Sequence, residues 1–167
     1  MIDLGDTMFN EIPLSKKRDE NYDKLLEMVP FYVNKADPLV SNLANLSALL
    51  NYFLDNINWI GFYLSDGKDA LYLGPFQGHP ACTSIRVGRG VCGMSAKLKK
   101  TVIVADVRDF EGHIFCDPNS RSEMVVPIVK EGRLIGVLDV DAPQVNRFSN
   151  KDQEVLEKVV KALVDIL

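Results

Sequence analysis

The chain has 167 residues, of which 47% are hydrophobic, and it carries a formal net charge of −4 at pH 7. This length and composition are typical of one globular domain that buries a core. The acidic balance argues against nucleic acid as a partner, because phosphate binding needs a concentrated basic surface. No stretch approaches the roughly 20 apolar residues that cross a bilayer. The N-terminus also lacks the regions of a signal peptide, so we expect a cytoplasmic protein that does not bind membranes.

The first part of the chain predicts an arm and two helices. Residues 1–20 are polar and mixed, and we expect a flexible N-terminal arm there, followed by a single domain over 21–167. Apolar spacing predicts a helix over residues 19–33, which Pro30 should kink or end. A second helix is expected over residues 37–55, with Asp37 as its cap and Pro38 at the first helical position.

Strand signals dominate the middle of the chain. Residues 57–64 and 70–77 predict a hairpin around Gly67, and 122–129 with 134–141 predict a second one. Between them we expect a short strand (83–87), a glycine-rich turn entering a helix (88–100) and another strand (101–107). Ser149 should cap a long amphipathic helix at the end of the chain. This order predicts an α+β domain with helices packed on one face of a central antiparallel sheet. The irregular stretch 106–121 is typical of a lid or a binding element.

The last predicted strand carries two carboxylates on one face. Side chains alternate faces in a strand, so Ile135, Val137, Asp139 and Asp141 should point the same way. The pair of acids is either a solvated strand end or the floor of a pocket. In a partly dry pocket, neighbouring carboxylates raise each other's pKa, and one can stay protonated as an acid.

Aromatic residues and a third acid could belong to the same place. Trp59, Gly61 and Tyr63 share a face, either as core residues or as a wall that holds an apolar group or a cation. Glu123, in the strand before the second hairpin turn, is either a surface acid or a third carboxylate aimed at the same space.

Three cysteines stand in turns and loops, an odd number for a compartment where structural disulfides are rare. His79 with Cys82 and His113 with Cys116 repeat one spacing, which suggests a metal site with two His and two Cys ligands. Alternatively the thiols are buried and inert, above all Cys92. A third interpretation is redox catalysis, in which one thiolate attacks and a second thiol resolves the sulfenic acid.

Local sequence does not decide which thiol attacks. Cys92 lies near a helix start, where the dipole would lower its pKa. Cys116 lies in a loop with His113 close by, but Asp117 should oppose its ionisation.

Several motifs together resemble one family. NWIGFYL, LGPFQGHPAC, GRGVCG, GHIFCD, SEMVVP, GVLDVDAP and RFS occur in the order and spacing of the free methionine-(R)-sulfoxide reductases, single-domain proteins with a GAF fold. The resemblance runs from about residue 37 to the last helix. It implies a GAF-like domain with a loop-rich lid over a pocket on the sheet face opposite the helices. It also implies an oxidoreductase that reduces free L-methionine (R)-S-oxide to L-methionine with a disulfide as acceptor, in oxidative stress repair, without metal or other cofactor.

The resemblance also implies roles for single residues. Cys116 would attack the sulfoxide and Cys82 would resolve the sulfenic acid, with Cys92 near the pocket as a secondary resolving group. Thioredoxin would then recycle the disulfide. The residues matching active-site acids or the substrate pocket are Glu123, Asp139, Asp141, Trp59 and Tyr63. Phe115 departs from the family, which more often has a small residue there.

Two other readings concern the whole chain. A GAF module could bind a small molecule without turning it over. Such modules usually report to an attached effector domain, for which we expect no segment here, and this reading leaves Cys82 and Cys116 without a role. The apolar terminal helices are also compatible with a homodimer, which would not exclude catalysis.

Overall fold

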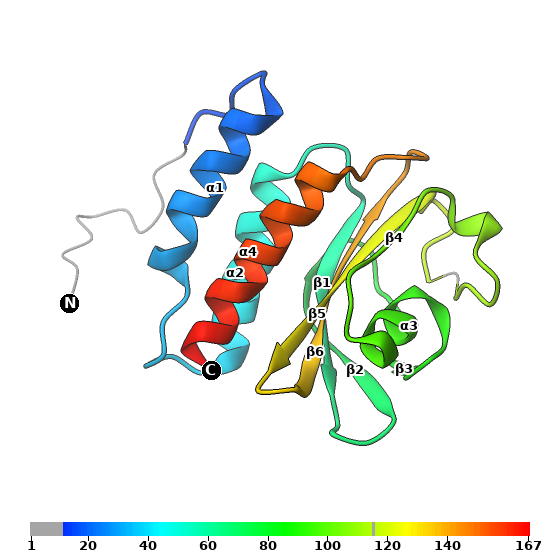
Figure 1. Ribbon diagram of the computed structural model, residues 1–167. Coiled ribbons are helices and arrows are strands. Elements are labelled where there is room, and N and C mark those ends of the chain that lie inside the picture. The colour runs from blue at the N-terminus through cyan, green and yellow to red at the C-terminus, as the bar shows by residue number, and fades with distance from the viewer. Residues whose placement is uncertain (1–11, 115) are drawn as a thin grey trace.

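A computed structural model describes residues 12–114 and 116–167 (Figure 1). Residues 1–11 of the expected arm and Phe115 lie outside this description. In chain order the elements are α1 (Arg18–Tyr32), α2 (Leu39–Phe53), β1 (Trp59–Ser65), β2 (Ala70–Gln77), β3 (Ser84–Arg86), α3 (Gly90–Leu98), β4 (Val102–Val104), the 3₁₀ turn η1 (Val107–Asp109), β5 (Ser122–Lys130), β6 (Arg133–Ala142) and α4 (Asn150–Ile166).

The strands form a six-stranded sheet in the order β3-β2-β1-β6-β5-β4, and all its neighbours are antiparallel. Both predicted hairpins, β1–β2 and β5–β6, are therefore confirmed. Helices α1, α2 and α4 lie on one side of the sheet, while α3 lies on the other with the loops around β3 and β4 (Figure 1). The predicted α+β architecture is confirmed, with the helix α3 on the face opposite α1, α2 and α4.

Two apolar clusters follow from the two faces. The larger joins α1, α2 and α4 to side chains such as Phe62, Leu138 and Val140. The smaller joins α3 to the opposite face, including Trp59 and Val137. Because adjacent side chains of β6 enter different clusters, the sheet separates a helix-packed core from the layer that contains the pocket.

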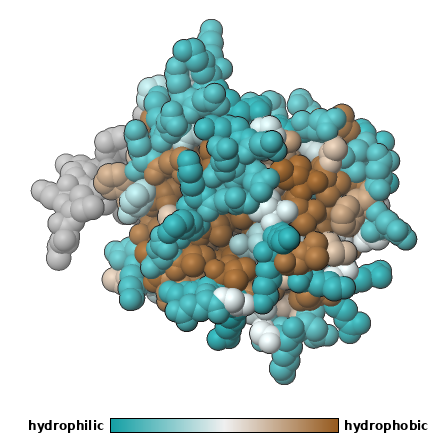
Figure 2. Space-filling model, viewed as in Figure 1, coloured by the Kyte–Doolittle hydropathy of each residue, from teal (hydrophilic) through white to brown (hydrophobic). Residues whose placement is uncertain are grey.

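Apolar residues also line a groove beside α4. A groove between α4 and β5 is lined in part by Val126, Val129, Val160 and Val164. Apolar residues are visible among hydrophilic ones on this side of the molecule (Figure 2).

Three details of the helix ends test the expectations from sequence. Helix α1 continues past Pro30 to Tyr32, so this proline does not end it. Asp37 does not cap α2. Pro38 occupies the cap position with an extended ψ of 141°, and no side chain caps the helix. Ser149 caps α4 as expected, in a capping box with Asp152.

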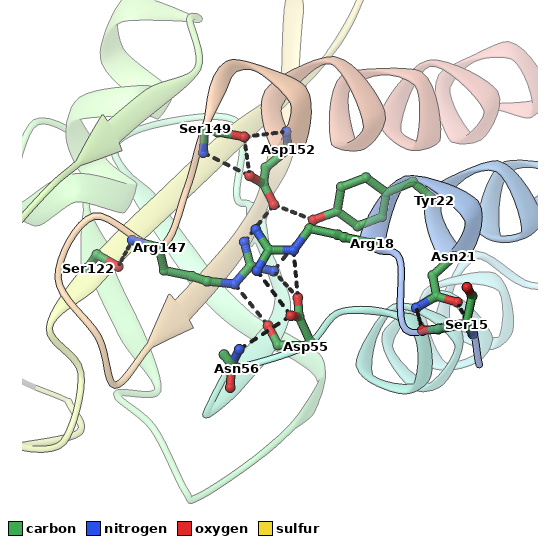
Figure 3. Close-up of polar contacts among 10 residues, drawn as sticks. All are labelled: Ser15, Arg18, Asn21, Tyr22, Asp55, Asn56, Ser122, Arg147, Ser149 and Asp152. Atoms are coloured by element: carbon green, nitrogen blue, oxygen red, sulfur yellow. Dashed lines mark hydrogen bonds and ion pairs between the residues drawn. The ribbon is translucent and has the colours of Figure 1, made fainter.

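A buried polar network ties α1 to α4 (Figure 3). Arg147 Nη1 donates to Asp152 Oδ1 at 2.6 Å, and its Nη2 donates to Asp55 Oδ1 at 2.9 Å. The Tyr22 hydroxyl, from α1, donates to the same Asp152. Arg18 also binds Asp55, at 3.0 Å. Arg147 and Asp152 are both buried, so their charges compensate each other inside the fold.

None of the helices in the described parts of the chain is long and apolar enough to span a membrane.

Candidate active site

Strand register gathers the predicted acids and aromatic residues on one face of the sheet. Trp59 on β1 lies opposite Asp141 on β6, which lies opposite Glu123 on β5. In the next row but one, Gly61 lies opposite Asp139. Directly opposed side chains on one face are about 5 Å apart at Cβ, so the three acids and the indole meet at one end of the sheet.

One residue of β6, Ile135, does not lie on the face that the sequence predicts for it. Ile128 pairs with Gly136 and Val129 with Leu134, so Ile135 is an extra residue at an irregularity. Its side chain packs against the helix-side core. The expectation that Ile135 shares the face of Asp139 is therefore wrong, because a bulge interrupts the alternation of side chains.

An aromatic wall stands beside the acids. Trp59 stacks on Tyr63 with 5.9 Å between ring centroids, and on Phe76 with 5.4 Å. Gly61 leaves room for the indole, because a Cβ there would lie 2.6 Å from Trp59 Cη2. All three aromatic residues belong to the pocket-side cluster. Trp59 and Tyr63 are thus both core residues and lining of the pocket.

Burial perturbs all three acids. It raises the pKa of Glu123 well above its usual value, and the charge of Asp141 adds to this effect. Burial also raises the pKa of Asp139 and of Asp141, each with a further contribution from a neighbouring acid. Oδ1 of Asp139 has no hydrogen-bond partner within the described residues. The site therefore favours protonated carboxyl groups and leaves one buried oxygen unsatisfied.

His113 contacts Glu123. Its Nε2 lies 3.0 Å from Oε2 of Glu123, and its side chain is 5% exposed. Burial lowers the pKa of His113 while it raises that of Glu123. These opposite shifts favour a protonated carboxyl group beside a neutral imidazole, and the tautomer of His113 sets which of the two donates the hydrogen bond.

Cys92 is a buried thiol of α3 that faces the same acids. Its Sγ lies 4.0 Å from Oε1 of Glu123. Burial raises its pKa well above the usual value, and Asp139 and Glu123 raise it further. The expectation that the helix start would lower this pKa is wrong, because desolvation and adjacent carboxylates outweigh the dipole.

Cys82 and Cys116 form a disulfide with 5.7 Å between their Cα atoms. Both residues are half-buried. The loop after Cys116 is held by Asp117, which accepts a hydrogen bond from Asn58 Nδ2 at 3.0 Å. Burial opposes ionisation of Asp117, but hydrogen bonds from the Asn119 N–H and Asn58 outweigh it and lower its pKa.

The structure does not assemble the two-His, two-Cys metal site. The two sulfurs are bonded to each other, His113 contacts Glu123, and His79 Nδ1 lies 3.6 Å from Asp117. A different set, Cys92, Glu123 and Asp139, places ligand-type atoms within 4.8 Å of one another. Burial raises the pKa of all three groups, which favours their protonated forms over the deprotonated forms that bind a metal.

One pocket collects most of the predicted site residues. Its lining includes Trp59, Tyr63, Cys92, Cys116, Glu123, Asp139 and Asp141. Cys82 is not among the lining residues, but its disulfide joins it to the pocket edge.

Sequence reasoning did not place four other residues at this site. His113, Arg89 and Ser120 also line the pocket, and Asn58 anchors the adjacent loop. The short spacing from His113 to Cys116 was a signal for the first. The other three lie outside the helices and strands of the structure, where no periodicity fixes the direction of a side chain.

Comparison with known proteins identifies the class. Residues 45–167 match the model of the GAF domain family. The chain is 47% identical over 128 residues to a free methionine-R-sulfoxide reductase of Escherichia coli, covering 77% of each protein. The fold is thus that of a GAF domain.

Solved structures narrow the identification. The fold matches fRMsr of Staphylococcus aureus in complex with substrate (46% identity, TM-score 0.83, 95% of this chain and 99% of that one). It also matches the free methionine-R-sulfoxide reductase of Neisseria meningitidis in complex with its substrate (39% identity, TM-score 0.86, 95% of each chain). The chain therefore belongs to the GAF domain family and, within it, to the family of the free methionine-R-sulfoxide reductases.

Proposed function

We propose that the protein reduces free L-methionine (R)-S-oxide to L-methionine, as an oxidoreductase that acts on sulfur with a disulfide as acceptor. The observation that carries the proposal is the Cys82–Cys116 disulfide at the edge of a pocket lined by three acids, of which Glu123 and Asp139 are buried. Both relatives with bound substrate share the fold over nearly the whole chain.

In the first step, the Cys116 thiolate attacks the sulfoxide sulfur. The sulfoxide oxygen takes a proton from a buried carboxyl group and is transferred to Cys116 as a sulfenic acid, so methionine leaves with its sulfur reduced by two electrons. Glu123, Asp139 and Asp141 are suited to this role, because their raised pKa values favour the protonated form.

In the second step, the Cys82 thiolate attacks the Cys116 sulfur. The S–S bond forms as the S–O bond breaks, and the oxygen leaves as water with a proton. A dithiol donor, thioredoxin, then supplies two electrons and two protons to reopen the disulfide. The half-buried position of Cys82 and Cys116 leaves them within reach of such a partner.

Substrate recognition follows from the lining. Trp59 packs the S-methyl group, with Tyr63 behind it. The unsatisfied Oδ1 of Asp139 is suited to an ammonium donor. Arg89 and the N-terminus of α3 present positive charge at the pocket, which suits the free carboxylate of an amino acid. The proposal also includes a cytoplasmic location, a homodimer and a secondary resolving role for Cys92.

The experiment is steady-state turnover with thioredoxin, thioredoxin reductase and NADPH. We expect consumption of the free R epimer, and none of the S epimer or of methionine sulfoxide within a peptide. Cys116→Ser should abolish turnover. Cys82→Ser should still release one methionine per chain and then cycle far more slowly with thioredoxin, because only Cys92 is left to resolve the sulfenic acid. Absence of turnover by the wild-type protein would favour a binding-only GAF module, and activity in Cys116→Ser would overturn the nucleophile.

A further inference from the structure

Two side chains of β1 hold the segment that carries Cys82. Trp59 Nε1 donates a hydrogen bond to the carbonyl oxygen of His79 at 3.0 Å. The Tyr63 hydroxyl donates to the carbonyl oxygen of Cys82 itself, also at 3.0 Å. Residues 78–83 form neither helix nor strand. An irregular segment is therefore fixed at two points to a central strand of the sheet.

The donor at Cys82 is rigidly held. Tyr63 is 1% exposed and stacks on Trp59, so its ring has little freedom to move. Burial raises its pKa, with Asp139 as the next contributor. The hydroxyl thus keeps its proton and remains a donor at the pH where the acids of the pocket act.

The hydrogen bond from Tyr63 to Cys82 matters most for the position of Cys82 when the disulfide is reduced. While the disulfide is closed, the covalent bond itself holds Cys82 near Cys116. Once it is reduced, only non-covalent contacts keep the segment of residues 78–83 in place for the next attack. A sulfenic acid is resolved only when the second thiolate can approach its sulfur opposite the leaving oxygen.

We propose that Tyr63 is a positioning residue for the resolving step, in which its hydroxyl holds the backbone of Cys82 so that the Cys82 sulfur reaches the sulfenic acid of Cys116. This inference rests on the proposed function. It gives Tyr63 a role in the second step, separate from the contact of its ring with the pocket. The hydroxyl transfers no proton. The S–S bond forms as the S–O bond of Cys116 breaks, and the oxygen departs as water.

The test uses Tyr63→Phe, which removes only the hydroxyl, and hydrogen peroxide as the oxidant. Peroxide converts the Cys116 thiolate to a sulfenic acid, with water as the other product, so binding of methionine sulfoxide plays no part. Loss of one hydrogen bond should slow disulfide formation about fivefold. A β-diketone that traps sulfenic acids should label the variant more heavily than the wild type. Stopped-flow mixing with timed thiol blocking measures both quantities.

Tyr52→Phe is the matched control. The Tyr52 hydroxyl also donates to a backbone carbonyl, that of Ile12 at 2.7 Å, but it lies beside the helix-side core. We expect this variant to form the disulfide at the wild-type rate. The proposal is overturned if Tyr63→Phe closes the disulfide as fast as the wild type, or if Tyr52→Phe slows it equally.

The two proposals fail separately. If the wild-type protein releases no methionine from methionine sulfoxide, the proposed function fails, whereas the peroxide experiment still measures how Cys82 is positioned. If the wild type turns over normally and Tyr63→Phe resolves its sulfenic acid at the wild-type rate, only the role of Tyr63 is lost.

Discussion

Glu123 shows how surroundings decide the chemistry of one side chain. One carboxyl oxygen contacts His113 and the other contacts the Cys92 thiol. By distance alone, the first contact would be an ion pair. The pKa shifts argue otherwise, because burial disfavours both the imidazolium and the carboxylate. Both shifts therefore favour a neutral hydrogen bond, with a protonated carboxyl group beside the pocket.

A pH dependence of stability follows from the raised pKa of Glu123. The folded protein holds a proton that the unfolded chain loses above its usual carboxyl pKa, so the free energy of unfolding should fall as pH rises toward the folded-state pKa. In Glu123→Gln this contribution is absent. Above the usual carboxyl pKa, the decline with rising pH should be shallower in the variant, by at most about 1.4 kcal/mol per pH unit.

Urea denaturation across this pH range measures the effect. Glu154→Gln, which changes an exposed acid of α4, should follow the wild-type curve. Equal slopes for Glu123→Gln and the wild type would mean that Glu123 is ionised in the folded protein.

At the scale of elements, the sequence predicted features that depend on local backbone geometry better than features that depend on contacts between distant segments. The period of a strand was enough to place Asp139 and Asp141 on one face, because the pleat is a property of the backbone itself. The pairing of Trp59 with Asp141 was not predictable in this way, since register is set by contacts between distant segments. Likewise, only the fold reveals the bulge at Ile135.

The wrong prediction for Cys92 and the missed position of His113 have the same physical cause, because both depend on tertiary contacts. Helix position correctly put Cys92 near the start of α3, but its pKa depends on how deeply the fold buries it. His113 approaches Glu123 from an irregular loop, where no period constrains the direction of a side chain. The family resemblance supplied the roles of Cys82 and Cys116, whereas their spacing alone left three alternatives open.

The β1 strand offers a direct test through Gly61. An alanine Cβ there would lie 2.4 Å from Phe76 Cβ and 2.6 Å from Trp59 Cη2, so the indole must move. We expect Gly61→Ala to lower the free energy of unfolding by about 1–3 kcal/mol. It should also raise KM for the sulfoxide. Trp59 is the only tryptophan in the chain, so its fluorescence emission reports the displacement.

Gly132→Ala separates displacement of the indole from destabilisation alone. Gly132 has a φ of +78° and no atoms within 4 Å of an added Cβ, so the change strains the backbone without a clash. It should leave the Trp59 emission unchanged. If Gly61→Ala also keeps the wild-type emission, the close packing around Gly61 is not what positions the indole.

At the scale of the whole molecule, the two faces of the sheet have different roles. The three longer helices and their apolar core stabilise one side, and the pocket occupies the other (Figure 1). The buried network of Arg147, Asp152 and Tyr22 joins the first helix to the last (Figure 3). Stability should therefore depend on residues that do not touch the pocket.

Arg147→Met tests this division. It leaves Asp152, which is 1% exposed, without its cation, and the expected loss in the free energy of unfolding is about 3–5 kcal/mol. Lys161→Met breaks the exposed pair with Asp165 on the same helix α4 and should cost less than about 1 kcal/mol. Chemical denaturation of both variants gives the comparison, and similar losses would contradict a structural role for the buried network.

The most direct test of the account is a single turnover without any reductant. Fully reduced protein is mixed with an excess of free methionine sulfoxide containing both sulfur epimers, and methionine, the remaining epimers and the cysteine pairing are quantified. We predict one methionine per chain, taken from the R epimer, together with a disulfide between Cys82 and Cys116. Absence of methionine, equal loss of both epimers, or product formed while both thiols stay reduced would contradict the account.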